Sequence, residues 1–263
     1  MKIEFHKYQG TGNDFILIDN RANQYDTVTE KQVAFLCNRH YGIGADGLML
    51  LNVKQGFDFE MKYYNADGGE GSLCGNGGRC MVKFAAKMGI HKTNYSFLAV
   101  DGDHEAEINP DGLVRLKMND VNKVDSYTNH YVLDTGSPHY VKHIRNVEQM
   151  DVKNDGRLIR YSKKFERNGI NVNFVEILDE DKIYVRTYER GVEDETLSCG
   201  TGVTASALVS AHNDNGFNHV EVRTPGGSLS VDFDKRGDSS FQNIWLNGPA
   251  TFVFKGDIEI STK

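Results

Sequence analysis

The 263-residue chain is short of cysteine, proline and tryptophan, with four, four and one of them, and it lacks a long hydrophobic run. No window approaches the roughly 20 apolar residues of a membrane helix, and residues 1–7 have no apolar stretch typical of an export signal. Four cysteines in a chain of this size, without such a signal, argue against structural disulfides. We therefore expect a cytoplasmic protein with reduced thiols and no membrane partner.

Positive charge is also scarce, since 30 Lys and Arg face 37 Asp and Glu for a net charge of −7. No helical face or tail gathers the Lys and Arg that would follow a phosphate backbone, so nucleic acid is not an expected partner. The hydrophobic fraction of 39% and charged fraction of 25% are typical of a globular protein rather than a disordered one. The 27 glycines predict many tight turns that carry function.

The second half of the chain repeats short segments of the first half at a constant interval. Residues 11–13 match residues 135–137, and residues 74–77 match residues 199–202, at intervals of 124 and 125. The pairs Tyr64-Asn65 with Tyr188-Glu189 and Asp101-Gly102 with Gly226-Gly227 keep this register. A repeat fixes the architecture. It predicts two similar lobes, residues 1–119 and 120–249, with residues 250–263 returning to the first.

Each half has the pattern of a strand, a glycine-rich turn and a helix. Residues 57–63 and 183–187 alternate between apolar and polar, which indicates half-buried strands. The runs 81–88 and 203–211 are apolar around most of a helix, so both helices should be buried and end near Gly89 and Gly216. A surface helix should begin at Thr29, with Gln32 completing a capping box, and end near Arg39.

The predicted fold class is therefore α+β, with two pseudo-symmetric lobes from an internal duplication. Each lobe should be a mostly antiparallel curved sheet around a buried helix. In such a duplication, the equivalent turns of the two lobes can meet in the cleft between them. We expect the active site there.

Cys74 and Cys199 each come directly before Gly-x-Gly and the start of a helix. Unpaired backbone N–H groups and the helix dipole favour negative charge at such a position and lower a thiol pKa. The amides that follow, of Gly75 and Asn76 and of Gly200 and Thr201, can hold a carboxylate. Each turn thus combines an acid or base with an anion site.

One sulfur on each side of a small molecule is the arrangement needed to invert a carbon centre. One group removes a proton from one face while the other delivers a proton to the opposite face. The resting pair should be one thiolate and one thiol. Because the chain shows no obvious site for pyridoxal phosphate, electrostatic stabilisation of the carbanion is left to the protein.

Other interpretations of these cysteines and glycines are weaker. Cys37 and Cys80 fall within helical patterns, have no equivalents in the other half, and are interpreted as core thiols. A zinc site from Cys37-x-x-His40 with Cys74 and Cys80 has poor spacing. The glycine turns lack the Lys-Ser/Thr of a phosphate loop and the Gly-x-Gly-x-x-Gly of a dinucleotide site.

Eight short segments, taken in order and spacing, resemble the diaminopimelate epimerases. They are residues 10–15 (GTGNDF), 39–46 (RHYGIGAD), 65–68 (NADG), 74–79 (CGNGGR), 138–139 (PH), 188–191 (YERG), 195–202 (ETLSCGTG) and 225–227 (PGG). The two cysteine motifs alone indicate the wider group of cofactor-free racemases and epimerases. The NDF and YERG segments point to the diaminopimelate enzyme.

The resemblance implies conversion of L,L-diaminopimelate to the meso form, for lysine and peptidoglycan synthesis, by a cytoplasmic homodimer without metal or cofactor. It implies that Cys74 and Cys199 are the catalytic acid/base pair and that His139 and Glu189 tune their pKa values. The residues it assigns to substrate binding are Asn13, Asn65, Gly75, Asn76, Asn171, Glu189, Arg190, Gly200 and Thr201. A carboxylate, a guanidinium and amides suit the zwitterion at the far end of diaminopimelate.

The chain departs from the usual pattern of these epimerases at two positions. Ser137 stands where many members have Asn, and Gly47 stands where some have Gln. Both changes remove a side-chain amide from the expected pocket, so a cofactor-free epimerase or racemase of another amino acid is the nearest alternative. A non-catalytic amino-acid-binding protein and a redox dithiol protein are alternatives from other classes.

Overall fold

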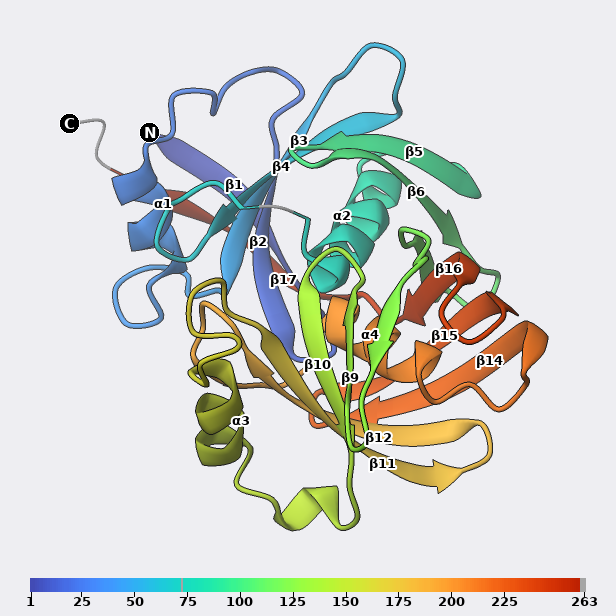
Figure 1. The fold of residues 1–263 in the computed structure, drawn as a ribbon. Helices are drawn as coiled ribbons and strands as arrows, with labels where there is room; N and C mark the ends of the chain where they lie inside the picture. Colours follow the sequence, from blue (N-terminus) through green and yellow to red (C-terminus); the bar gives the residue numbers. More distant parts are fainter. Residues whose placement is uncertain (72, 261–263) are drawn as a thin grey trace. The chain divides into compact units, whose positions relative to one another are not determined.

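The structure, a computed structural model, describes residues 1–71 and 73–260. The chain divides into two compact units, which we call the first lobe (Met1–Leu116 with Pro249–Lys263) and the second lobe (Lys117–Gly248). The sequence predicts that residues 250–263 return to the first lobe; residues 261–263 of this segment lie outside the described residues. Each lobe combines a mixed sheet with two α-helices, which confirms the α+β class (Figure 1).

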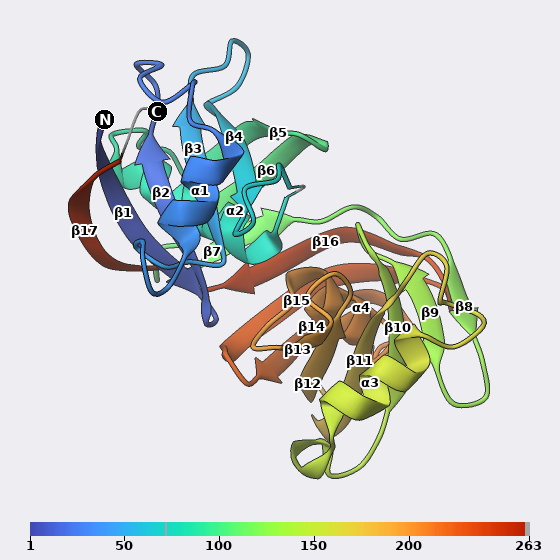
Figure 2. The same cartoon turned by 90° about the vertical axis from the view of Figure 1, so that its left-hand side faces the viewer.

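The sheet of the first lobe follows from its strand pairings. Antiparallel pairs join β17 to β1, β1 to β2, β3 to β4, β5 to β6 and β6 to β7, whereas β2–β3 and β4–β5 are parallel. The strands are β1 (Lys2–Gly10), β2 (Asn13–Asp19), β3 (Gly47–Asn52), β4 (Phe59–Asn65), β5 (Asn94–Ala99), β6 (Gly102–Ile108), β7 (Val114–Lys117) and β17 (Thr251–Glu259). Figure 2 shows β17 running beside β1.

The second lobe is built in the same way. Antiparallel pairs join β8 to β9, β9 to β10, β11 to β12, β12 to β13, β14 to β15 and β15 to β16, whereas β10–β11 and β12–β14 are parallel. The strands are β8 (Val124–Ser126), β9 (Tyr131–Asp134), β10 (Pro138–His143), β11 (Asn171–Asp179), β12 (Lys182–Glu189), β13 (Asp194–Thr196), β14 (Asn215–Thr224), β15 (Gly227–Arg236) and β16 (Phe241–Gly248).

The two lobes share one order of connections. A parallel pair requires a crossover, and each of the four carries an α-helix. In the first lobe these are α1 (Glu30–Cys37) and α2 (Gly75–Lys87), and in the second lobe they are α3 (Val152–Arg160) and α4 (Gly200–Leu208). A short 3₁₀ helix, η1 (Val147–Gln149), precedes α3. The repeat seen in the sequence is therefore a repeat of topology.

In each lobe, the two helices cover opposite faces of the sheet. On β11, Val172 and Phe174 pack in a cluster with Val152 of α3, whereas Val175 packs with Val203 of α4. Alternate side chains of a strand point to opposite faces, so this division separates the two helices. In the first lobe, Leu48 and Leu50 share a cluster with α1, while Met49 lies against α2 at Gly77.

The predicted helix ends are partly confirmed. Thr29 caps α1, with the capping box to Gln32 present. Gly89 follows α2 with a φ of 93°, as a left-handed cap requires. The prediction for Gly216 was wrong, because α4 ends at Leu208 and Gly216 lies in β14. There the Asn218 side chain accepts the N–H of Asn213, which stabilises a turn instead of a longer helix.

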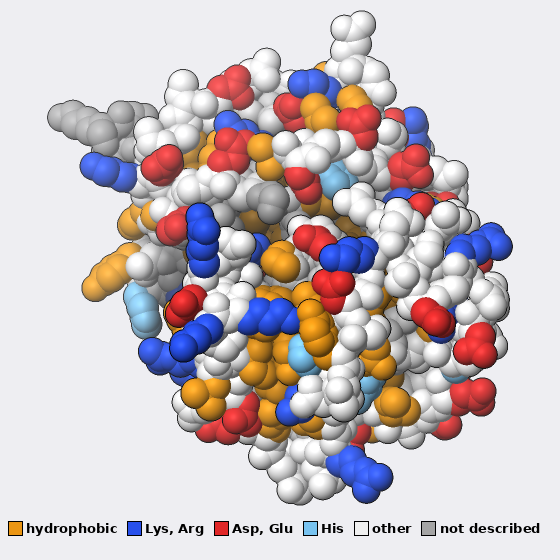
Figure 3. Space-filling view, viewed as in Figure 1, with side chains coloured by type: hydrophobic (Ala, Val, Ile, Leu, Met, Phe, Trp, Pro, Cys, Tyr) orange, Lys and Arg blue, Asp and Glu red, His pale blue; other side chains and the backbone are white. Residues whose placement is uncertain are grey.

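The surface carries charges of both signs. On the face seen in Figure 3, acidic and basic side chains are interspersed.

Among residues 1–71 and 73–260, no helix combines the length and apolarity needed to cross a membrane.

Gly156 of α3 provides a test of the helix packing in the second lobe. At an exposed position in a helix, replacing Gly by Ala raises the free energy of unfolding by about 1 kcal/mol. Here an added Cβ would lie 2.4 Å from the Cβ of Tyr188. We therefore expect Gly156→Ala to lower the free energy of unfolding by about 1–3 kcal/mol in urea denaturation. Leu158→Ala, at a side chain that is 73% exposed on the same helix, is the control and should change it little. A stabilised Gly156→Ala protein would contradict this packing.

Candidate active site

Both cysteines are the N-cap residues of buried helices. Cys74 precedes α2 with φ −92° and ψ 123°, and Cys199 precedes α4 with φ −115° and ψ 113°. Neither cap makes a side-chain hydrogen bond to the helix backbone. The first backbone N–H groups of each helix have no intrahelical acceptor. Each sulfur therefore sits at the positive end of a helix dipole, next to amides that favour an anion.

The turn between β1 and β2 places Asn13 beside Cys74. Thr11 and Gly12 both have positive φ, 50° and 85°, as a two-residue hairpin loop requires. The Cys74 thiol donates to Asn13 Oδ1 at 3.4 Å, and Asn76 Nδ2 donates to the same oxygen at 3.4 Å. Asn13 Nδ2 in turn donates to Asp46 Oδ2 at 2.5 Å. Three predicted site residues of the first lobe, Asn13, Cys74 and Asn76, thus lie in one network.

Arg79 of α2 donates hydrogen bonds to this network. Its side chain is fully buried, and its Nη2 donates to Asn76 Oδ1 at 3.0 Å and to Thr11 Oγ1 at 3.4 Å. Its other bonds go to the carbonyls of Gly75 and Pro249, so no carboxylate is among its partners in the described residues. Burial lowers the pKa of Arg79 to about 10, which leaves it charged at neutral pH.

His139 holds the corresponding position beside Cys199. It is fully buried on β10, with Nε2 at 2.9 Å from Thr201 Oγ1 and Nδ1 at 3.0 Å from Asn173 Nδ2. Thr201 Oγ1 lies 3.5 Å from the Cys199 sulfur. Burial lowers the pKa of His139 to about 3, with a smaller effect from the positive charge of Arg190. The imidazole is therefore neutral at physiological pH.

Asn171 and Arg190 form a second polar group in this lobe, together with Ser137. Asn171 Nδ2 donates to Ser137 Oγ at 2.9 Å, and its Oδ1 accepts the backbone N–H of Arg190 at 2.9 Å. Arg190 Nη2 also donates to Ser137 Oγ, at 3.3 Å. Ser137 therefore binds two of the residues that the resemblance assigns to substrate binding.

The remaining predicted site residues end the strands that lead into the cysteine turns. Asn65 is the last residue of β4 and is exposed. Glu189 is the last residue of β12 and is half-buried. Gly75 and Gly200 are buried in the first turns of α2 and α4. Among the described residues, the Asn65 side chain makes no hydrogen bond to the Asn13 network.

The sequence matches one protein family along nearly its whole length. The sequence model of that family, described as diaminopimelate epimerase, matches residues 5–124 and 131–253. The chain belongs to the diaminopimelate epimerase family. It is accordingly an isomerase.

Curated relatives agree with this assignment. A diaminopimelate epimerase of Flavobacterium psychrophilum is 48% identical over 97% of this chain and 100% of its own length. One of Chlorobaculum tepidum is 44% identical, over 95% of this chain and 99% of its own.

Solved structures show the same fold at low sequence identity. A PhzF-family phenazine biosynthesis protein of Bacillus anthracis has a TM-score of 0.76 at 14% identity, over 99% of this chain and 100% of that one. A hydroxyproline epimerase of Agrobacterium vitis has a TM-score of 0.68 at 14% identity, over 98% and 92%. These likenesses concern the fold alone.

The Gly47 position of this epimerase family member has no room for a side chain. A Cβ there would lie 2.4 Å from Cε2 of Tyr63 and 2.7 Å from the carbonyl oxygen of Tyr64. The Tyr63 ring also lies against Gly71, at 2.8 Å from the place of its Cβ. Tyr63 therefore fills the space that a longer residue 47 would take.

Sequence reasoning did not assign roles to Asp46, Arg79 and Asn173, although each holds a site residue in place. Asp46 and Asn13 are 33 residues apart, so no local pattern links them. Asn173 carried a usable signal, because it is a polar residue between apolar neighbours and shares a face of the strand with Asn171. Arg79 also carried one, as a charged residue in a helix predicted to be buried all round.

The two other cysteines are core residues, as predicted. Cys37 of α1 is 3% exposed and Cys80 of α2 is 0% exposed. Burial raises the pKa of each thiol to about 12, so both are protonated and inert. Within the described part of the chain, no group of three His, Cys, Asp or Glu is placed to hold a metal.

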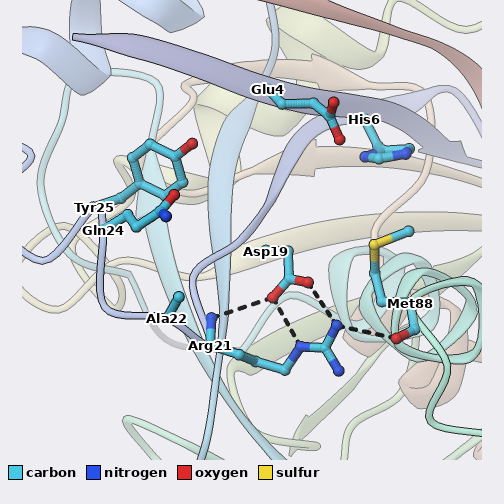
Figure 4. Close-up of a pocket in the computed structure, with 8 residues that line it drawn as sticks. All are labelled: Glu4, His6, Asp19, Arg21, Ala22, Gln24, Tyr25 and Met88. Carbon is cyan, nitrogen blue, oxygen red and sulfur yellow. Dashed lines mark hydrogen bonds and ion pairs between the residues drawn. The ribbon is translucent and has the colours of Figure 1, made fainter.

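A recess of about 520 Å³ in the first lobe lies away from the cysteine turn (Figure 4). It is lined by Glu4, His6, Asp19, Arg21, Ala22, Gln24, Tyr25 and Met88. Arg21 pairs with Asp19 through two nitrogens and donates to the Met88 carbonyl at the end of α2. Arg21, Asp19 and the Met88 carbonyl already bond one another, and no lining residue belongs to the cysteine network, so we interpret the recess as structural.

The buried neutral His139 predicts a loss of stability in acid. In the unfolded chain the histidine has a pKa of 6.5 and binds a proton below that pH, whereas in the folded protein His139 binds one only near pH 3. Stability present above pH 6.5 is therefore lost progressively as pH falls toward 3. We expect the thermal midpoint of the wild-type protein to fall more steeply between pH 7 and 4 than that of His139→Gln.

The exposed His40 provides the control, since His40→Gln should keep the wild-type slope. Parallel profiles for the wild-type and His139→Gln proteins would show that His139 is protonated in the folded state.

Proposed function

We propose that this protein converts L,L-diaminopimelate to meso-diaminopimelate without a cofactor, with Cys74 and Cys199 as acid and base. The observation that carries the proposal is the placement of both cysteines as N-caps of buried helices, at equivalent points of a duplicated topology. Membership of the family and the names of its curated relatives support the substrate. The product serves lysine and peptidoglycan synthesis.

The chemistry is a proton exchange at the α-carbon of the amino acid. A thiolate takes the α-proton from one face, and the thiol of the other cysteine delivers its own proton to the opposite face. The carbon is thereby inverted, and the two sulfurs have exchanged protonation states. In the reverse reaction their roles are exchanged.

The α-proton of an amino acid is a very weak acid, so the carbanion must be stabilised. Negative charge develops on the adjacent carboxylate. The first-turn amides of Gly75, Asn76, Gly200 and Thr201 offer N–H groups and two helix dipoles for that charge. Such groups are fixed before the reaction begins and act most strongly where water is excluded.

The distal end of the substrate is a zwitterion, and the polar side chains near the turns suit it. We propose that Arg190 binds the distal carboxylate, and that Glu189 and the amides of Asn13, Asn65 and Asn171 bind the remaining groups. Ser137 supports this assignment, because its hydroxyl bridges Asn171 and Arg190. We further propose that His139 and Glu189 tune the thiol pKa values.

Substitution of each cysteine tests the mechanism. Cys74→Ser and Cys199→Ser should each lower turnover by at least about 10³-fold, since a serine hydroxyl is far too weak an acid to form the needed anion. The assay is proton NMR of L,L-diaminopimelate in deuterium oxide with reduced protein, which follows loss of the α-proton signal and appearance of the meso isomer.

Cys37→Ala is the matched control, because this thiol is buried outside the network and should leave turnover intact. Retained turnover in Cys74→Ser would contradict the two-thiol mechanism. A wild-type protein that exchanges the α-proton of another amino acid but not of diaminopimelate would keep the mechanism and change the substrate.

We also propose that the protein is a cytoplasmic homodimer, as the family resemblance implies. A surface of the first lobe supports self-association. Strand β17 leaves Phe252, Val253 and Phe254 exposed by 38%, 51% and 45%. Such an apolar run is typical of a surface that a partner covers.

Light scattering after size exclusion tests this proposal. The wild-type mass should be twice 29.5 kDa, and Val253→Asp should give the monomer mass with an unchanged circular dichroism spectrum. An unpaired charge in the centre of an interface is costly because it loses water without gaining a partner. Val192→Asp, at a side chain that is 56% exposed in the second lobe, should remain a dimer. A monomeric wild-type protein would contradict the proposal.

A further inference from the structure

Three neighbouring strands of the first lobe place Phe15, Gly47 and Asn65 in one row. Gly47 of β3 is the register partner of Phe15 on β2 and of Asn65 on β4. Register partners on adjacent strands point to the same face of a sheet, and so do residues two apart along a strand. Asn13 and Tyr63 therefore share this face with the row.

Helix α2 covers this face but does not bury Tyr63 completely. Met49, two residues after Gly47, lies against Gly77 of α2. Met49 and Phe15 are fully buried, whereas Tyr63 is half-buried. Part of the Tyr63 side chain is therefore accessible on the face that leads into the cysteine turn.

The Tyr63 ring crosses over Gly47 toward Phe15. A Cβ at Gly47 would lie 2.4 Å from Cε2 and 2.9 Å from the hydroxyl oxygen of Tyr63. The Tyr63 and Phe15 rings meet edge to face, with their centroids 6.2 Å apart. Gly47 leaves a gap between Phe15 and Asn65 because it has no side chain, and the ring fills that gap.

The other edge of the ring lies against Gly71. A Cβ there would lie 2.8 Å from Cδ1 and Cε1 of Tyr63 and 3.0 Å from Nδ2 of Asn65. The Gly71 N–H donates to the Tyr63 carbonyl at 3.0 Å, which fixes the start of the segment that leads to Cys74. The ring and the Asn65 amide thus border the same small space.

The order of groups on this face matches the order of groups in diaminopimelate. Asn13 Oδ1 lies 3.4 Å from the Cys74 sulfur, so its amide marks the end where the proton is exchanged. Asn65 lies two strands away, about 10 Å across the sheet. The Tyr63 ring lies between the two amides. Diaminopimelate likewise has a zwitterion at each end and three methylene groups between them.

We propose that Tyr63 is a specificity-determining residue, whose ring forms a wall against the three methylene groups and limits the length of chain between the two zwitterions. This inference rests on the proposed function. An aromatic ring offers a large, rigid apolar area, which suits contact with methylene groups. In an apolar site, one methylene group too many or too few changes kcat/KM by about 10- to 200-fold.

A role in sheet stability alone is the alternative, because an aromatic ring that covers a glycine stabilises the strands around it. Two observations favour contact with the substrate. The ring is half-buried although the neighbouring Phe15 is fully buried. It is also flanked by Asn13 and Asn65, whose side-chain amides are proposed to bind the substrate. A ring that only stabilised the sheet would affect all substrates alike.

Kinetics of Tyr63 variants test the contact. Tyr63→Ala removes the wall and should raise KM for L,L-diaminopimelate at least about tenfold. The change in kcat should be below about threefold, because the lost binding is shared by substrate and transition state. Tyr63→Phe keeps the ring and should keep the wild-type KM. A Tyr63→Phe protein as weak as Tyr63→Ala would overturn the proposal, because the hydroxyl would then be the group that binds.

Chain length is a readout that a structural role would not move. Diaminosuberate has one more methylene group than diaminopimelate, and Tyr63→Ala provides space for it. We expect the ratio of kcat/KM for diaminosuberate to that for diaminopimelate to rise at least about tenfold in Tyr63→Ala. Proton NMR in deuterium oxide measures both reactions through the loss of the α-proton signal. An unchanged ratio would overturn the proposal.

Lys62→Ala is the matched control for these measurements. Lys62 lies on the same strand but on the opposite face, with its Nζ 5.2 Å from the centroid of the Tyr64 ring. This variant should keep the wild-type KM and the wild-type ratio. If Tyr63→Ala fails to fold, as judged by circular dichroism, Tyr63→Leu carries the same test, because leucine covers Gly47 but is smaller than tyrosine.

Calorimetric binding of diaminopimelate separates failure of this proposal from failure of the proposed function. A wild-type protein that binds diaminopimelate more tightly than Tyr63→Ala but does not exchange its α-proton would refute the function and support the wall. Exchange with the same KM and the same ratio in both proteins would refute the wall and support the function. A wild-type protein that does not bind diaminopimelate would refute both.

Discussion

The connection between parallel strands is the constraint on which the rest of this structure depends. Strands β4 and β5, and likewise β12 and β14, run in the same direction, so the chain must cross back over the sheet between them. A helix makes each crossing and begins after the loop that follows the strand. The residue at that junction has unpaired backbone N–H groups in front of it. In this protein a cysteine occupies both junctions.

The two junctions share a frame but differ in the side chains around it. A hairpin with Thr11 supports the first turn, and the corresponding Thr135 supports the second by donating to the Thr201 carbonyl at 2.8 Å. Beyond this, the first lobe has amides held by charged residues, whereas the second has a histidine and a hydroxyl.

The site costs stability in both lobes. Arg79 is a buried charge without a carboxylate partner in the described residues, and His139 is a buried base that stays neutral. Hydrophobic residues of similar size would pack there without desolvation cost. Arg79 bonds Asn76, which bonds the same Asn13 oxygen as the Cys74 thiol, and His139 bonds Thr201, which lies beside the Cys199 sulfur. These links give a functional reason for keeping both residues. The inert Cys37 and Cys80 show that burial alone turns a thiol into a core residue.

The sequence by itself determined the features that local chemistry encodes. The repeat, the capping box at Thr29, the buried helices after each cysteine and the α+β class all follow from spacing and periodicity. Helix α3 was not foreseen. Gly216 was misjudged because the Asn218 side chain stabilises a turn where a longer helix was expected. Only the tertiary structure could pair Asp46 with Asn13, or Asn173 with His139. These partners are 33 and 34 residues apart, and the direction of a hydrogen bond depends on where chain folding places each donor and acceptor.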